Sequence, residues 1–458
     1  MYVAVKTRQQ VAAAGGEVTV DFYLINEKNV RGNHQLKISV TDSQGKVMEV
    51  GTYETEAAGG EVYGQLLVKD VKIPVPTAGG LCRIEAKLCK ENSVVTTGYD
   101  DILSVNLASN MLDGKGAVWE DGSALQNFLK GKTKEAVAAY EDNLGKLDWI
   151  MVARPPRKDQ LTMVPMEALR SADGKPGLDV VYYEDMEFQK EVYHEVAKVV
   201  NLSAIEGATP SPFVYMLDGY GIKWSGKVLP SVSGEYTIIP QSNDRSMIEV
   251  FVNGKKIYEI TRKKKHLGDG KVYLEGGKSA DIEIRFRHPR SNARCRLDWA
   301  VPNDKMPDAQ RLMERAVNDG TKIFIIQSAD EWSEFIAVNS KAVFKDKFFV
   351  GTNWLGGVMF NKPHDIFKEL PVGNALNWPY QALIHTGVER MGLVMEGEEL
   401  LVGAYHTYPM AIGTAMGIVP MGKGSVLFST LDIYGNIIND SAAGLVAKKL
   451  IFNMIDFK

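Results

Sequence analysis

Apolar and polar residues alternate with a period of two in two separate stretches of the chain, which is the pattern of half-buried β-strands. In the first stretch, residues 1–108, strand-like runs such as Val18 to Leu24 and Leu81 to Cys89 are separated by turns such as Ala58-Gly-Gly60. Strands that recur every ~10–15 residues without a helix between them predict an immunoglobulin-like β-sandwich over residues 1–108.

Helical and strand-like patterns alternate in the segments that follow. The apolar run Leu147 to Ala153 reads as a strand, and far downstream the strand Lys322 to Ile326 follows a helical pattern at 308–318. Such alternation is typical of a mainly parallel sheet flanked by helices. Because neither segment holds enough strands alone, we predict that residues 109–175 and 303–458 form one α/β domain.

The second alternating stretch, residues 176–302, interrupts this α/β domain. Runs such as Met247 to Val252 and Asp281 to Arg287 alternate, and Asn253-Gly254 is a strong signal for a two-residue hairpin turn. We therefore predict an inserted β-sandwich. The whole chain is then a multidomain protein with two β-sandwiches and one α/β domain.

Charge and composition limit the partners and cofactors that the chain is expected to bind. With 53 Lys and Arg against 57 Asp and Glu, the net charge of -4 provides no overall field for nucleic acid or an anionic membrane. No run of about 18 apolar residues predicts a membrane span, and the first residues lack the pattern of a signal peptide. The three cysteines and seven histidines have no metal-ligand spacing, so no metal site and no cofactor are predicted.

Several stretches of the insertion resemble a known module. They are Gly221 to Gly226, Ser233 to Thr237, Val250 to Lys255 and Arg296 to Trp299. These residues are similar to the protective-antigen-type β-sandwich that is inserted in many bacterial glycosidases and adhesins. The family usually has an acidic pair and a glycine where this chain has Asn243-Asp244-Arg245, which weakens any transfer of a calcium site to this chain.

The other two domains resemble parts of large glycosidases. Tyr2 to Lys6, with Asp21 to Glu27, is similar to the sandwich that follows the catalytic barrel in family 2 glycoside hydrolases of the β-galactosidase type. Gly356 to His364, with Phe367 to Pro371 and Trp378 to Tyr380, resembles a glutamine-amidotransferase-like, flavodoxin-like domain. The resemblance implies a periplasmic or secreted bacterial protein whose partners are a catalytic barrel, upstream or on another chain, and further copies of itself in a homo-oligomer.

The sequence predicts no catalytic residue. A family 2 glycosidase needs two carboxylates in a barrel of about 250 residues, for which the two sandwiches leave no room. Amidotransferase chemistry needs a cysteine at a strand-to-helix turn, and all three cysteines lie in the β-sandwich segments. The residue at that turn is Ser328, and Glu331 three residues later predicts a helix capping box rather than a serine nucleophile.

Glycan binding instead requires planar polar groups for the sugar hydroxyls and aromatic faces for its C–H surface. Trp224 and Trp299 lie in strand-like runs and are predicted to be core residues. We predict that the basic run Arg262 to His266 is a solvated loop rather than a nucleic-acid site. The predicted glycan-binding residues are Tyr220, Asn243, Asp244, Arg245, His288, Arg290 and Asn292.

The leading hypothesis is a non-catalytic accessory segment of a bacterial glycoside hydrolase, which binds a carbohydrate ligand and supports domain or subunit assembly. Trp354, Trp378, Tyr380 and Tyr408 are candidate anchors of an assembly interface, although each fits a core position better. Two alternatives stay open. The chain could be a hydrolase in its own right with a site in the α/β domain, or an independent carbohydrate-binding adhesion protein.

Overall fold

The computed structural model describes residues 1–60, 62–91, 93–107, 111–156, 161–204, 209–211, 214–242, 245–263, 265–290, 293–302, 307–350, 357–385, 391–407, 410–438 and 442–457. The chain forms two compact units. The first contains Met1–Asn110, Lys362–Gln381 and Asp440–Lys458, and the second contains Met111–Asn361 and Ala382–Asn439.

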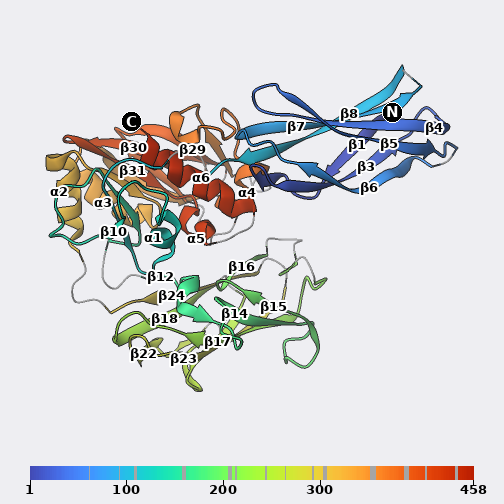
Figure 1. Ribbon diagram of the computed structural model, residues 1–458. Helices are drawn as coiled ribbons and strands as arrows, with labels where there is room; N and C mark the ends of the chain where they lie inside the picture. Colours follow the sequence, from blue (N-terminus) through green and yellow to red (C-terminus); the bar gives the residue numbers. More distant parts are fainter. Residues whose placement is uncertain are drawn as a thin grey trace. The chain divides into compact units, whose positions relative to one another are not determined.

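The first unit contains the N-terminal β-sandwich (Figure 1). One sheet has three strands in the order β1 (Tyr2–Thr7), β3 (Glu17–Ile25) and β6 (Gly64–Pro74). The other has five strands, which in spatial order are β2 (Val11–Ala13), β8 (Ser93–Val105), β7 (Gly80–Lys90), β4 (Gly32–Thr41) and β5 (Val47–Ala57). Alternation along β7 buries Ile84, Ala86 and Leu88, which confirms the β-rich pattern predicted for this part of the chain.

A buried lysine anchors the C-terminal helix of the same unit. This helix, α6 (Ala442–Asp456), accompanies two short 3-10 helices, η3 (Asp365–Phe367) and η4 (Trp378–Tyr380). Lys449 is 4% exposed, and its ammonium donates to the Asn106 carbonyl at 3.1 Å and to the Glu369 carboxylate at 2.7 Å. Of the predicted interface anchors, Tyr380 is buried and Trp378 is half-buried, whereas Trp354 and Tyr408 lie outside the described residues.

The second unit is built around a ten-stranded mixed sheet. Five strands are parallel, in the spatial order β10 (Ala138–Ala139), β9 (Gly116–Glu120), β11 (Trp149–Ala153), β25 (Lys322–Ile325) and β31 (Gly424–Ser429). Numbered by their appearance in the chain, these strands follow the order 2-1-3-4-5. The remaining strands are β30 (Met410–Met421), β28 (Met391–Glu396), β26 (Val343–Phe349), β29 (Glu399–Thr407) and β27 (Val358–Asn361), and they pair antiparallel. The prediction of a mainly parallel sheet is therefore wrong for half of its strands.

Helices α2 (Ala309–Asp319) and α3 (Ala329–Val338) pack on this sheet, and α1 (Ala124–Leu129), α4 (Gln381–His385) and α5 (Ile433–Ile437) are shorter. The predicted helix at 308–318 is confirmed. Its N-terminus is capped by the Asp308 carboxylate, which accepts the backbone N–H groups of Gln310 and Arg311, and it ends at Gly320 in the left-handed conformation.

The inserted sandwich has one sheet of eight strands and one of five. The larger sheet contains β13 (Leu169–Arg170), β14 (Leu178–Tyr183), β15 (Glu191–Ala197), β17 (Tyr220–Val228), β19 (Met247–Val252), β20 (Lys255–Ile260), β21 (His266–Leu267) and β23 (Ala280–His288). The smaller contains β12 (Thr162–Met163), β16 (Asn201–Ala204), β18 (Gly234–Ser242), β22 (Lys271–Leu274) and β24 (Ala293–Ala300). Strands β12 and β13 precede residue 176, so the sandwich includes strands from the segment 109–175.

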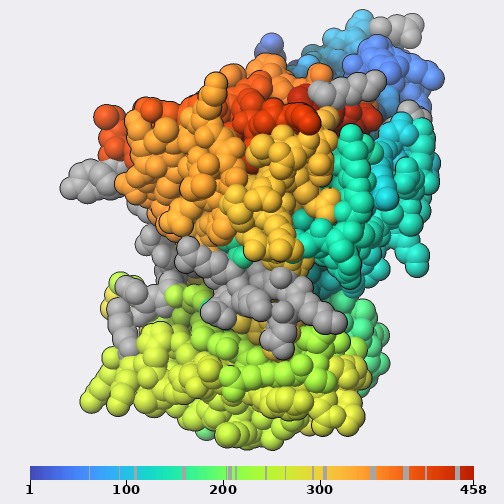
Figure 2. Space-filling model, turned by 90° about the vertical axis from the view of Figure 1, so that its left-hand side faces the viewer, coloured from blue at the N-terminus to red at the C-terminus, as the bar shows by residue number. Residues whose placement is uncertain are grey.

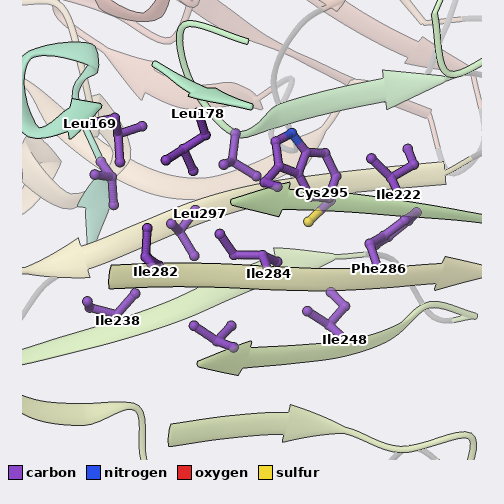
Figure 3. Close-up of a cluster of buried hydrophobic side chains, with 14 of the residues drawn as sticks. Leu169, Leu178, Ile222, Ile238, Ile248, Ile282, Ile284, Phe286, Cys295 and Leu297 are labelled. Carbon is purple, nitrogen blue, oxygen red and sulfur yellow. The ribbon is translucent and has the colours of Figure 1, made fainter. Parts of the chain in front are cut away.

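The core of this sandwich lies between the two sheets (Figure 3). Ile222 and Phe286 come from the larger sheet and Cys295 and Leu297 from the smaller one, and each is at most 1% exposed. Trp224 and Trp299 are buried in the same core, which confirms that they are core residues. The predicted hairpin turn is also confirmed, because Asn253 and Gly254 both have the positive φ angles that such a turn requires.

Candidate ligand-binding site

A cavity of about 640 Å³ lies at one end of the inserted sandwich. Its walls come from the segments after β14, before β19, after β20 and after β23, and the module's surface is green to yellow in Figure 2. The volume is within the range of ~300–1,000 Å³ that is usual for small-molecule sites. The lining residues are Met186, Glu187, Arg245, Ser246, Met247, Thr261, Arg262, Arg287 and Pro289.

The wall formed by Met186 and Glu187 is fixed by the carboxylate of Asp185. This side chain accepts backbone N–H groups from Glu187 at 2.7 Å, from Gln189 at 3.1 Å and from Lys190 at 2.6 Å. Burial acts to raise the pKa of Asp185, but these N–H groups favour the charged form more strongly and hold the pKa below its ordinary value. The turn is therefore held by an ionised carboxylate at neutral pH.

Arg287 forms a second wall and is held on three sides. Its Nη1 donates to the Glu249 carboxylate at 2.9 Å, and its Nε donates to the Met186 carbonyl at 3.0 Å. The Phe188 ring lies below the guanidinium, with 4.7 Å between Cζ and the ring centroid. Three contacts of this kind fix a long side chain in one rotamer, so Arg287 shapes the cavity before any ligand binds.

Two further arginines border the cavity from separate loops. Arg245 precedes β19 and Arg262 follows β20, and both side chains are exposed. Neither has an ion-pair partner among the residues that the structure describes. The only acidic side chain among the described lining residues is Glu187.

Two of the predicted site residues lie below the cavity rather than in it. Tyr220 is 1% exposed and His288 is 0% exposed, so both belong to the sandwich core. The His288 ring stacks on Phe286 with 5.8 Å between centroids, and its Nδ1 lies 3.1 Å from the hydroxyl of Ser246, which lines the cavity. Burial, followed by the nearby charge of Asp218, raises the pKa of Tyr220 above its ordinary value. Both residues can support the loops that line the cavity, but their side chains do not reach the cavity surface.

Of the other five predicted residues, the structure describes two. Arg245 lines the cavity together with Pro289, so the structure brings together the two loops that were singled out in the sequence. Arg290 is exposed next to Pro289, and Asn243, Asp244 and Asn292 lie outside the described residues. In the described part of the chain, no group of three His, Cys, Asp or Glu side chains could hold a metal ion.

Sequence reasoning did not identify Arg262, Arg287 or the Met186–Glu187 wall. The signal for Arg262 was present, because it begins the basic run to His266 that was interpreted as a solvated loop. Arg287 alternates with Arg285 at the end of β23 and reads as an ordinary exposed strand residue. Only the folded arrangement shows that it meets Arg245 and Arg262 at one cavity.

A second cavity of the same unit, of about 380 Å³, lies beside Ser328 and is lined by residues of the α/β part together with Gln241, Arg296 and Asp298 of the inserted sandwich. Ser328 joins β25 to α3 with a φ of 54° and a ψ of 36°, and its side chain makes no capping hydrogen bond. The predicted capping box is therefore wrong, since the backbone N–H of Glu331 bonds to the Ser328 carbonyl at 3.0 Å instead. Among the described lining residues there is no histidine that could serve as a general base for Ser328.

The comparisons with known proteins concern mainly the inserted sandwich. Residues 174–311 match the family described as PA14 domain. The anti-sigma-I factor RsgI3 of Acetivibrio thermocellus is 26% identical over 125 residues, which cover 27% of this chain and 19% of that protein. The chain therefore matches only about a fifth of the length of this curated relative.

Solved structures show weaker likeness. A β-glucosidase from Kluyveromyces marxianus matches 49% of this chain and 30% of its own at 13% identity, with a TM-score of 0.35. The PA14 sugar-binding domain of an RTX adhesin matches 27% of this chain and 88% of its own at 14% identity, with a TM-score of 0.22. No helix among the described residues is both long and apolar enough to cross a membrane. The match over residues 174–311 shows that the inserted sandwich is a PA14 domain, which confirms the protective-antigen-type module predicted from the sequence.

Proposed function

We propose that this chain is a non-catalytic accessory segment of a bacterial glycoside hydrolase of the β-galactosidase type, and that its PA14 domain binds glycan. The observation that supports glycan binding is the cavity of about 640 Å³ at the loop end of that domain. Its arginine and glutamate side chains supply hydrogen-bonding groups for hydroxyls, and Met186, Met247 and Pro289 supply apolar surface for a sugar's C–H groups.

The other domains serve assembly in this proposal. The strand order 2-1-3-4-5 is the order of flavodoxin-like domains, which supports a flavodoxin-like, amidotransferase-like domain without a nucleophile. The N-terminal sandwich is then an immunoglobulin-like spacer. A catalytic barrel lies upstream or on another chain, and the whole protein is periplasmic or secreted. An independent carbohydrate-binding adhesion protein would use the same cavity.

A glycan array probed with the full chain tests the proposed function. Hits are then titrated calorimetrically against the wild type and against Met247→Trp, which places a larger side chain in the cavity. Met247 is half-buried on β19 and faces solvent at the cavity, so the variant is expected to fold. Tyr273→Trp is the matched control, because Tyr273 is 67% exposed on β22 and does not line the cavity.

We expect at least a tenfold loss of affinity in Met247→Trp and none in Tyr273→Trp. Binding is expected to be weak, because an open site exchanges water hydrogen bonds for protein ones with little net gain. An array without any hit, or equal affinity in both variants, would count against glycan binding at this cavity.

A further inference from the structure

We propose that the PA14 cavity selects an acidic sugar residue, one that carries a carboxylate or a sulfate group. This inference rests on the proposed glycan binding and names the class of ligand. Of the lining residues that the structure describes, three are arginines and one is a glutamate, whereas the whole chain has a net charge of -4. The charge of the described cavity lining is therefore positive, opposite in sign to that of the whole protein. Binding of a neutral sugar does not require such a positive charge.

Arg287 is not the cation that binds the ligand's charge. Its guanidinium is already paired with Glu249 at 2.9 Å, and the same carboxylate also accepts from Lys256 at 3.2 Å. This network neutralises Arg287 and keeps it in place as a wall. The charge available to a ligand comes from the other two arginines.

Arg245 and Arg262 have the properties that such a role requires. They approach one cavity from two different loops, and neither has an ion-pair partner in the described part of the chain. Like charges that converge on one space repel each other, and a bound anion removes this repulsion. The planar guanidinium also matches two oxygens of a carboxylate or a sulfate at once, which the ammonium group of lysine cannot do.

The remaining walls suit a sugar better than a nucleic acid or a lipid surface. Met186, Met247 and Pro289 provide apolar contacts in an open cavity whose volume of about 640 Å³ suits a small ligand. A membrane or a nucleic acid would instead be bound by a larger cluster of lysines and arginines that contacts several phosphate groups. The cavity also includes Glu187. Its carboxylate can accept hydrogen bonds from sugar hydroxyls, but it would repel the neighbouring phosphate groups of a nucleic acid or a membrane.

The test uses the full chain and three sets of oligosaccharides with comparable backbones: neutral, uronate-containing and sulfated. Affinities are measured calorimetrically at two salt concentrations, with single-stranded DNA and anionic vesicles as further probes. The variant Arg245→Gln/Arg262→Gln removes both free cations. The matched control is Lys278→Gln, which removes an exposed cation beyond the opposite end of β23.

We expect the wild type to bind at least one acidic set about tenfold or more tightly than the neutral set, with weaker binding at high salt. The double variant should lose this preference, while Lys278→Gln should keep it. Arg262→Lys retains the charge but not the planar fork, so an intermediate affinity is expected. The uronate and sulfate arms show which anion is preferred. Circular dichroism melts confirm that the variants fold, which exposed positions such as these should permit.

Equal binding of neutral and acidic sugars, or an unchanged preference in the double variant, would overturn the acidic-ligand inference and leave glycan binding intact. Tighter binding to DNA or vesicles than to every oligosaccharide would also overturn it. Binding to none of the three oligosaccharide sets would instead contradict the proposed function itself.

Discussion

Individual carboxylates in this protein owe their roles to the groups that surround them. Asp21 is 7% exposed, and its carboxylate accepts the Asp70 backbone N–H at 2.8 Å and the Arg8 guanidinium at 3.0 Å. These two partners, the backbone N–H first, outweigh burial and lower the pKa of Asp21. Asp101 in contrast pairs with Arg83 on the surface, where solvent screens the interaction.

The Asp21 contacts predict a pH-dependent contribution to stability. A carboxylate whose pKa is lowered by folding stabilises the folded state above its unfolded pKa of ~3.9, and this contribution disappears as the pH falls through the folded pKa. Asp21→Asn should therefore reduce the free energy of unfolding at pH 7 by about 1–2 kcal/mol, and the difference from wild type should shrink on acidification. Denaturant titrations of the full chain, followed by the unfolding of the first unit, measure this difference in free energy.

Asp101→Asn is the matched control and should cost less than about 0.5 kcal/mol. If Asp21→Asn were as mild as this control at pH 7, the buried contacts of Asp21 would not carry the stability assigned to them.

Spacing in the sequence could not reveal the conformation of Ser328. Ser and Glu three residues apart are a good signal for a capping box, and this was the prediction. The signal assumes an extended backbone at the cap, whereas Ser328 has a positive φ and its side chain makes no capping hydrogen bond. Similarly, Tyr220 and His288 were predicted as site residues from their residue types. His288 instead continues the buried alternation of Ile284 and Phe286 along β23, and Tyr220 is buried opposite it on β17.

At the scale of elements, local patterns predicted helices, strands and turns, but not the direction in which strands pair. The helix at 308–318 and the hairpin at Asn253-Gly254 follow from local signals, and both are present. The apolar run Leu400 to Gly403 also reads as a strand and lies in β29, which pairs antiparallel with β27 and β30. The pattern of a single strand does not show the direction of its neighbours, so this half of the sheet was wrongly expected to be parallel.

A β-bulge in β7 decides on which face of the strand its two cysteines lie. Cys82 and Cys89 are seven positions apart in β7, which should place them on opposite faces. Both are buried, at 1% and 4% exposure, because the register shifts between Leu88 and Cys89. A one-residue irregularity of this type has no clear signal in the strand sequence.

The N-terminal cap of α2 gives a prediction for a single element. Asp308→Ala removes the carboxylate that accepts the N–H groups of Gln310 at 2.7 Å and Arg311 at 3.3 Å. The loss of such a cap costs about 1 kcal/mol, which should appear as a lower melting temperature of the α/β part. Asp319→Ala at the other end of the helix is the control. Its effect should be neutral or slightly stabilising, because an acid is unfavourable near a helix C-terminus.

For the molecule as a whole, we propose a binding and assembly role without catalysis. The cavity beside Ser328 contains acidic and hydroxyl side chains, but no histidine lies among its described lining residues. Folded domains alone do not catalyse a reaction, and hydrolysis needs a placed acid together with a nucleophile or an activated water.

The full chain is therefore expected to release no chromophore from aryl β-galactosides, β-glucosides or β-glucuronides above background. The assay is run at high protein concentration, with Ser328→Ala alongside the wild type. Turnover that disappears in Ser328→Ala would show instead that the chain is a hydrolase and that the turn before α3 carries its nucleophile.

Hydrogen–deuterium exchange of the full chain can locate the proposed glycan site at the loop end of the PA14 domain. With a bound oligosaccharide, exchange should slow in the cavity-lining segments at 186–187, 245–247, 261–262 and 287–289, and stay unchanged around Lys278 and in the first unit. Protection centred on the Ser328 cavity or on the N-terminal sandwich, with the PA14 loops unaffected, would contradict the proposed site.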